Sequence, residues 1–262
     1  MLSIYTSAFN IESGLFDWQY SLDRFSEFAE QVVVGTTALS NDNSCNLLRD
    51  YAKTKSNVKI VVTDFSLDDL AFDGKIKNAA LKSCDQPFCM LLDLDEMPRL
   101  KDKPAWVNFA SYLGMTDYDA FLIPVIDLYN TDREYKSIGM KWYLHKNAPD
   151  LNRGIVDFAW TDDKKLHINI SQSDTCELIK DDGRLCNSIP LLDKLSLPAI
   201  NDLGIKIFHT GWISKEKRLL VNGFWSSVWS NRAGYKVNNI IDTTEELNDI
   251  PYYPHKLKLW YE

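Results

Sequence analysis

Two aspartates and a glutamate follow an apolar run near the middle of the chain. Residues 88–92 read Phe-Cys-Met-Leu-Leu, and Asp93, Asp95 and Glu96 come directly afterwards. A run this short and this apolar predicts a central strand that is covered on both faces. The acids would then lie at the carboxyl end of that strand, where open α/β sheets bind their ligands. Two carboxylates at such a place suit a hard divalent cation that also holds phosphate oxygens.

These acids also have an ordinary interpretation as surface charges. Asp-x-Asp occurs by chance in acidic proteins, and most carboxylates are solvated. Their position directly behind a buried strand favours a function, because clustered acids repel one another unless a positive charge is bound. On this hypothesis Asp95 binds the cation, while Asp93 reaches a sugar hydroxyl or the water shell of the metal.

The elements that must position the acids alternate regularly over the first 100 residues. Strands are expected at 2–8, 31–35, 58–62 and 88–92, and helices at 17–30, 45–53 and 75–84. Strands that alternate with helices at this rhythm predict a parallel sheet with right-handed crossovers.

The rhythm changes after residue 100, where the pattern favours a mixed and partly antiparallel extension of the sheet. Strands are expected at 120–128, 138–145, 155–160, 166–170 and 204–208, and helices at 104–113 and 214–232. Gly234 is a plausible stop signal for the last helix. Residues 171–203 carry few periodic cues, so we expect loops and short helices there. We divide the chain into 1–100, 101–235 and a tail, 236–262, that packs on the body.

Composition excludes several classes of function. The chain has 262 residues, 45% of them hydrophobic, which is enough for a large α/β core. Its net charge of −8 argues against non-specific binding to the phosphates of nucleic acids. No apolar run has the length of about 20 residues that a membrane span needs. Five cysteines without Cys-x-x-Cys spacing fit a reduced, cytoplasmic setting better than a disulfide framework or a zinc knuckle.

Five short segments together resemble the GT-A glycosyltransferases, in particular the inverting family 2 type that builds bacterial polysaccharides and lipopolysaccharide cores. The segments are the strand end at 5–10 (Tyr-Thr-Ser-Ala-Phe-Asn), the turn with Ser40, Asp42 and Ser44, the pair Lys77-Asn78, the acids at 92–96, and 207–212 (Ile-Phe-His-Thr-Gly-Trp). The segment 92–96 is specific by itself, and the order and spacing of all five make the resemblance.

This resemblance implies a fold and an activity. The fold would be a Rossmann-like GT-A fold, with a mostly parallel central sheet flanked by helices and a mixed extension on the acceptor side. Residues 1–100 would bind the nucleotide-sugar and residues 101–235 the acceptor. The activity would be metal-dependent transfer of a sugar, with inversion, from a nucleoside-diphosphate sugar to a hydroxyl acceptor such as a glycan. Such an enzyme is a hexosyltransferase-type glycosyltransferase that uses Mn²⁺ or Mg²⁺.

The resemblance also assigns candidate site residues. Asp95 and His209 would bind the cation, since a neutral imidazole at a strand end can complete such a site. The donor would be held by Thr6, Ala8, Phe9, Lys77, Asn78 and Asp93. Glu96 would hold the ligating residues in place without binding the cation itself. His209 is equally well explained as a hydrogen-bonded structural histidine, Lys77 as a solvated surface lysine, and Phe9 as part of the core.

Inverting transfer needs a general base that takes the proton of the acceptor hydroxyl. Asp157, in the segment Arg-Gly-Ile-Val-Asp at 153–157, occupies the place comparable to the acid of the resembling enzymes. Asp127, Asp162 and Asp182 are rivals for this role. The basic pair His145-Lys146, at the end of an expected strand, would meet the donor phosphates or the acceptor.

Other functions fit the sequence less well. Asp-x-Asp phosphatases want Thr or Val two residues past the second aspartate, where this chain has Met97. A nucleotidyltransferase would want a basic, glycine-rich loop after the first strand, and residues 7–14 contain no basic residue. The resembling enzymes usually read the nucleotide base with an aspartate at the end of the second strand, where Thr37 stands here. This departure keeps open a catalytically degenerate protein that only binds sugars or partners.

Overall fold

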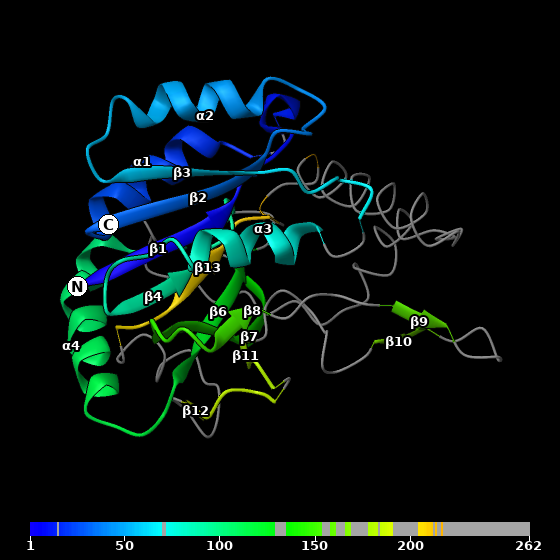
Figure 1. Ribbon diagram of the computed structural model, residues 1–262. Coiled ribbons are helices and arrows are strands. Elements are labelled where there is room, and N and C mark those ends of the chain that lie inside the picture. The colour runs from blue at the N-terminus through cyan, green and yellow to red at the C-terminus, as the bar shows by residue number, and fades with distance from the viewer. Residues whose placement is uncertain are drawn as a thin grey trace.

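The computed structural model describes most of the first 153 residues and shorter segments beyond them. The described residues are 1–14, 16–69, 72–128, 135–153, 158–160, 166–168, 178–182, 184–190, 204–211, 213 and 216. The largest sheet among them has nine strands, in the order β3-β2-β1-β4-β7-β6-β13-β5 with β12 beside β6 (Figure 1). Five of its strand pairs are parallel and three are antiparallel. This mostly parallel sheet with helices on both faces confirms the predicted Rossmann-like architecture of a GT-A fold.

The first half of the sheet is a regular series of parallel strands with helical crossovers. Its strands are β1 (Leu2–Ser7), β2 (Gln31–Thr37), β3 (Val58–Thr63) and β4 (Phe88–Leu91), and its helices are α1 (Trp18–Phe28), α2 (Ser44–Ala52) and α3 (Phe72–Leu81). Successive side chains of a strand point to opposite faces, and β1, β2 and β4 are buried on both, whereas the edge strand β3 is only partly buried. Ile4 and Val32 face α1 and α2, whereas Tyr5 and Val33 face α3.

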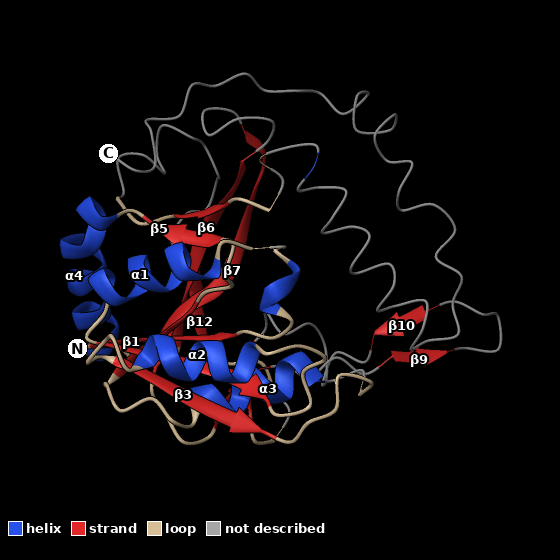
Figure 2. Cartoon of the chain, turned by 90° about the horizontal axis from the view of Figure 1, so that it is seen from above, coloured by secondary structure: helices blue, strands red, loops and turns tan. Residues whose placement is uncertain are grey.

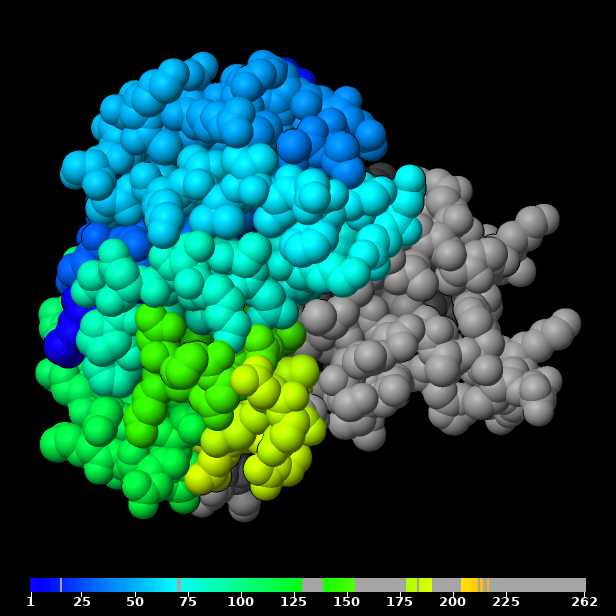
Figure 3. All heavy atoms as spheres, in the orientation of Figure 1, coloured from blue at the N-terminus to red at the C-terminus, as the bar shows by residue number. Residues whose placement is uncertain are grey.

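The second half mixes directions. Its elements are β5 (Glu96–Pro98), α4 (Lys103–Gly114), β6 (Ala120–Leu128), β7 (Tyr135–Lys146), β12 (Ser188–Pro190) and β13 (Ile207–His209). The long strands β6 and β7 run antiparallel beside each other (Figure 2). Strand β7 pairs with β4 and so joins the two halves, while β13 lies between β6 and β5. Figure 3 shows the blue and cyan first half packed directly against the green second half.

Two small sheets and two short helices complete the described elements. β8 (Leu151–Arg153) pairs with β11 (Leu178–Lys180), and β9 (Phe158–Trp160) pairs with β10 (Leu166–Ile168). The 3-10 helices η1 and η2 cover Ile11–Ser13 and Leu100–Asp102. No helix within the described residues is long and apolar enough to cross a membrane.

A glycine sets the position of α3 on the sheet. A Cβ atom on Gly35 of β2 would lie 2.7 Å from the carbonyl oxygen of Ile76 and 2.8 Å from its Cγ2 atom. The helix therefore packs against the strand at this point without an intervening side chain. Because Lys77 is the next residue, this close approach also places its side chain beside the carboxyl ends of β1 and β4.

The sequence predicted most of these elements, with shifted ends. Helix α3 begins at Phe72 where we expected residue 75, and the strand expected at 204–208 is observed as Ile207–His209. The helix expected at 214–232 lies outside the described residues except for residue 216, as do its stop signal at Gly234, the tail and most of 171–203. Loops and short helices were expected at 171–203, but the residues described there include the strands β11 and β12, which form by pairing with the distant strands β8 and β6.

Candidate functional site

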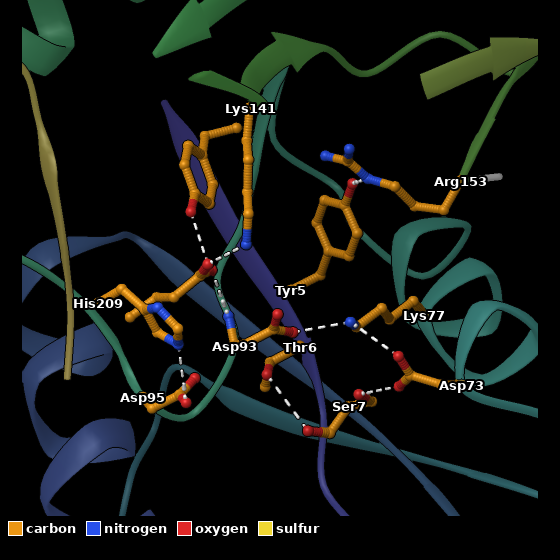
Figure 4. A network of polar contacts seen from close by, with 12 residues as sticks. Tyr5, Thr6, Ser7, Asp73, Lys77, Asp93, Asp95, Lys141, Arg153 and His209 are labelled. Carbon is orange, nitrogen blue, oxygen red and sulfur yellow. Dashed lines mark hydrogen bonds and ion pairs between the residues drawn. The ribbon is translucent and has the colours of Figure 1, made fainter. Parts of the chain in front are cut away.

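The candidate site lies where β1 and β4 end and where β13 pairs with β6 and β5. Figure 4 shows its acidic and basic side chains directed toward one another from these strands and from α3. The segment that carries Asp93 and Asp95 is held in place by its neighbours: Leu92 donates its backbone N–H to Tyr5, and the Ser21 hydroxyl of α1 donates to the carbonyl of Leu94. The acids thus extend from a fixed loop at the end of a buried strand, as predicted.

Asp95 and His209 come from distant parts of the chain and face each other. The Oδ2 atom of Asp95 lies 3.1 Å from Nε2 of His209, and Nδ1 of the same ring lies 2.8 Å from Oδ1 of Asp127. Burial alone would lower the pKa of His209. The nearby charge of Asp95 and the hydrogen bond to Asp127 outweigh burial and raise this pKa to about 10. The site therefore attracts positive charge at this position.

The two residues after His209 fit closely around Asp95. Thr210 donates both its backbone N–H (2.7 Å) and its hydroxyl (3.0 Å) to the carbonyl oxygen of Asp95. A Cβ atom on Gly211 would lie 2.7 Å from Oδ2 of Asp95 and 2.8 Å from Nε2 of His209. Glycine therefore leaves open the space next to the two atoms best placed to hold a cation.

Lys77 forms ion pairs with two carboxylates of the site, those of Asp73 and Asp93. Its Nζ atom lies 2.7 Å from Oδ1 of Asp93 and 2.9 Å from Oδ2 of Asp73, and Ser7 donates its hydroxyl to Asp73 at 2.6 Å. Only 3% of Lys77 is exposed. The Asp93 side chain is 32% exposed. Its partial burial raises its pKa, but the charges of Lys77 and Lys141 prevail and lower it to about 2, so Asp93 is ionised.

Glu96 is buried behind the two aspartates and holds their loop. Its Oε1 atom accepts hydrogen bonds from Lys141 (2.6 Å) and from the hydroxyl of Tyr143 (2.5 Å), and its Oε2 atom accepts from the backbone N–H of Asp93 (3.0 Å). This agrees with the supporting role expected of Glu96, and it brings Lys141 to the edge of the site.

The balance of charge and the donor types fit a divalent cation. Five carboxylates meet two lysines and one histidine; the carboxylates are those of Asp73, Asp93, Asp95, Glu96 and Asp127. Within the described residues, no three His, Cys, Asp or Glu side chains are arranged around one point as a complete metal cage. Mg²⁺ is commonly bound by one or two carboxylates together with waters and substrate phosphates, and Asp95 supplies such a carboxylate, with His209 beside it.

Comparisons with known proteins found similarity only among solved structures. No protein-family model matches this chain, and no curated protein matches it. One similar structure is S. aureus TarS 1-349, with 15% identity and a TM-score of 0.46 over 89% of this chain and 67% of that chain. The complex of the same TarS segment with UDP-GlcNAc gives 12% identity, a TM-score of 0.44, and coverage of 94% and 77%.

A third similar structure is M. tuberculosis glucosyl-3-phosphoglycerate synthase in complex with Mn²⁺, UDP and phosphoglyceric acid. It gives 16% identity and a TM-score of 0.31, over 49% of this chain and 43% of that chain. This chain spans 47% of a longer TarS structure.

The remaining predicted donor-binding residues lie near the end of β1 or on α3. Thr6 is buried and donates its hydroxyl to the Ser7 carbonyl at 3.4 Å, and Ala8 is buried and bonded through its N–H to Gly35. Phe9 is partly buried, and its ring packs edge-on against Phe72 with 4.8 Å between centroids. The roles of these residues in binding stay predictions.

The candidate bases differ in what the structure describes. Asp157 and Asp162 lie outside the described residues. Asp182 is exposed and pairs with Arg184, whereas Asp127 belongs to the site through His209. Pattern reasoning assigned no role to Asp73, Lys141, Thr210 or Gly211, although Thr210 and Gly211 lie in the segment 207–212 that is part of the resemblance. For Asp73 a signal existed, because it stands four residues before Lys77 on one helix face; the others depend on strand pairing that no local pattern reveals.

Asn78 connects α3 to β8. Its Nδ2 group donates to the carbonyl of Arg153 at 3.0 Å, and its Oδ1 atom accepts from the backbone N–H of Arg153 at 2.8 Å. We expect Asn78→Ala to lower the free energy of unfolding by about 1–3 kcal/mol, because two partly buried hydrogen bonds are lost. Urea unfolding measures this. Asn46→Ala on the exposed face of α2 is the control and should change stability by no more than about 0.5 kcal/mol. An equal, small loss in both variants would contradict the prediction.

His145 lies in the core, away from the candidate site. This differs from the expectation that it would contact the phosphates of the sugar donor or the sugar acceptor. It is fully buried; its Nε2 atom lies 2.9 Å from the Tyr5 hydroxyl, and its Nδ1 atom lies 2.8 Å from the Lys146 carbonyl. Arg153 in turn donates to the Tyr5 hydroxyl. Burial, and then the charge of Arg153, lower the pKa of His145 to about 3, so the folded protein keeps this ring neutral.

A pH dependence of stability follows from this buried histidine. Below its ordinary pKa of 6.5 the unfolded chain binds a proton that the folded chain does not bind until about pH 3. The stabilising contribution is therefore complete above pH 6.5 and is lost as the pH falls from 6.5 toward 3. Between pH 7 and pH 5 we expect His145 to account for a loss of about 2 kcal/mol.

The variant His145→Gln tests this contribution. Glutamine does not titrate, so the variant should lose less stability than the native protein between pH 7 and pH 5, whatever its stability at pH 7. Urea unfolding at both pH values gives the difference. Equal losses in the two proteins would show that folding does not shift the pKa of His145.

Proposed function

We propose that this protein is a metal-dependent glycosyltransferase that moves a sugar from a nucleoside-diphosphate sugar to a hydroxyl acceptor, with inversion. The observation that carries the proposal is the pair Asp95 and His209, whose Oδ2 and Nε2 atoms face each other at 3.1 Å beside the space that Gly211 leaves open. Asp95 and His209 would hold Mn²⁺ or Mg²⁺. The cation would stabilise the charge that develops on the leaving diphosphate.

The protein's own side chains would do the remaining work. Asp93, kept ionised by Lys77, would accept a hydrogen bond from a sugar or ribose hydroxyl. Lys77, buried between Asp73 and Asp93, would add positive charge beneath the phosphates and keep Asp93 in place. Lys141, whose side chain is 28% exposed beside Glu96, would face the donor from the opposite strand.

The other residues that the sequence analysis singled out have proposed roles as well. Thr6, Ala8, Phe9 and Asn78 would line the donor side, within residues 1–100. Asp157 would act as the general base for a glycan or another hydroxyl acceptor bound by residues 101–235. The reaction would be of the hexosyltransferase type and would take place in the cytoplasm.

A panel of nucleoside diphosphates tests the proposal. With Mn²⁺ present, one of UDP, GDP, ADP or CDP at about 100 times its Kd should add about 2.7 kcal/mol of stability, seen as a rise in Tm. The same nucleotide with EDTA should add little. Transfer or hydrolysis of the matching sugar nucleotide then separates an enzyme from a protein that only binds.

The binding-only alternative has one supporting observation. Thr37, at the position where the resembling enzymes carry an aspartate, is buried and donates its hydroxyl to the Phe65 carbonyl at 2.6 Å. It therefore holds the loop after β3 onto β2. Cation-dependent binding of a nucleoside diphosphate, with neither transfer nor hydrolysis of any sugar nucleotide, would favour this alternative.

A further inference from the structure

Asp127 and His209 are side by side because of how β6 and β13 pair. The two strands are parallel, and His209 is the direct register partner of Asp127. Directly opposed residues of adjacent strands direct their side chains to the same face of the sheet. The result is the 2.8 Å contact between Oδ1 of Asp127 and Nδ1 of His209. A shift of one residue in this pairing would turn the histidine to the other face.

This contact determines which nitrogen of His209 is available at the site. A carboxylate at Nδ1 favours a proton there, because the ionised oxygen only accepts hydrogen bonds. When a dication takes the place of the proton that Nε2 otherwise shares with Asp95, the lone pair that binds it is the one on Nε2, beside the space at Gly211. Histidines that bind metals generally donate their other ring N–H to such a partner, which fixes the tautomer and the direction of the ring.

We propose that Asp127 is a positioning residue that holds His209 with its proton on Nδ1 and presents Nε2, together with Asp95, to a divalent cation. This inference rests on the cation site of the proposed function. It also separates Asp127 from the candidates for the general base, because its Oδ1 atom is engaged with His209 on the side of the ring away from Asp95.

The two roles of Asp127 predict different measurements. A base acts on the acceptor, so its removal would lower kcat and leave the affinity for the cation unchanged. A positioning residue acts on the histidine, so its removal should weaken binding of the cation before any substrate is added. Titration of the full chain with Mn²⁺ alone therefore distinguishes the two roles. The electron paramagnetic resonance signal of the free ion measures how much Mn²⁺ is bound.

Two variants probe the interaction at Asp127. Asp127→Ala removes the partner of Nδ1, and Asp127→Asn can donate its amide N–H to Nδ1 and so keep the ring proton on Nε2. Both should bind Mn²⁺ about 10–100-fold more weakly than the native chain. The matched control is Asp119→Asn, which removes one carboxylate at the opposite end of β6, where Asp119 pairs with Lys180. It should bind Mn²⁺ as the native chain does.

Three results would overturn the inference, and they can be told apart. If the native chain binds no Mn²⁺, the cation site of the proposed function is wrong and Asp127 has no cation to serve. If the native chain binds Mn²⁺ and both Asp127 variants bind it equally well, only the positioning role is wrong. If Asp119→Asn weakens Mn²⁺ binding as much as the two Asp127 variants do, the loss of affinity reflects the net charge of the chain and not the contact with His209. Urea unfolding of each variant confirms that the chains compared are folded.

Discussion

The variant Asp95→Asn is expected to lose cation-dependent binding of nucleoside diphosphates and to transfer sugar roughly 100–1,000-fold more slowly than the native protein, a loss of about 3–4 kcal/mol. The amide is neutral and is a poor ligand for a dication that also faces His209. The fold should persist, because Thr210 binds the backbone carbonyl of Asp95 and not its side chain. Titration calorimetry with Mn²⁺ and the nucleotide selected from the panel, followed by turnover, measures both effects.

The control for Asp95→Asn is the same substitution at Asp182. That carboxylate is exposed, pairs with Arg184 and lies away from His209. Asp182→Asn should bind the cation and the nucleoside diphosphate as the native protein does. Normal cation binding by Asp95→Asn would remove Asp95 from the site and the proposed function with it.

A single added methyl group at Gly211 is expected to disable the same site from the other side. The Cβ of Gly211→Ala would lie 2.7 Å from Oδ2 of Asp95 and 2.8 Å from Nε2 of His209, closer than such atoms approach in folded proteins. Both contacted atoms are side-chain ends, so the side chains can move apart while the backbone stays. A displacement of about 1 Å at reacting groups costs roughly 100-fold in rate.

The expected signature of Gly211→Ala is therefore weak Mn²⁺ binding and slow transfer in a chain that unfolds at nearly the native urea concentration. Gly114→Ala, at the end of α4, is the matched control, since its Cβ would meet only the Phe88 ring, at 3.0 Å from Cζ. A variant at Gly211 with native affinity for Mn²⁺ would show that the space beside it is not where the cation binds.

Local patterns predicted the part of the fold that local chemistry determines. The apolar run 88–92 and the acids after it were correctly placed at the end of a buried strand, and alternation along 120–128 predicted β6 with its observed bounds. His209 was expected at a strand end, and it is the last residue of β13. In each case the signal lies within a few consecutive residues.

The rest depends on partners that are distant in sequence. Nothing in the residues around Lys77 reveals that it is buried between Asp73 and Asp93, because a lysine is normally exposed and only the ion pairs make its burial tolerable. Likewise, no local feature of β7 tells that it inserts between β4 and β6. That insertion removed His145 from the site and brought Lys141 to it.

The three-residue strand β13 has a consequence for how the protein is made. It joins β5 and β6 late in the chain, so the contact between residues 95 and 209 spans 114 positions. Contacts of such long range form slowly, because a large loop must close before they contribute. During synthesis the first half can collapse around its own core well before residue 209 leaves the ribosome. The pair proposed to bind the cation is thus among the last features to assemble, and a nascent chain that stops short of β13 would be folded in part but would lack the proposed site.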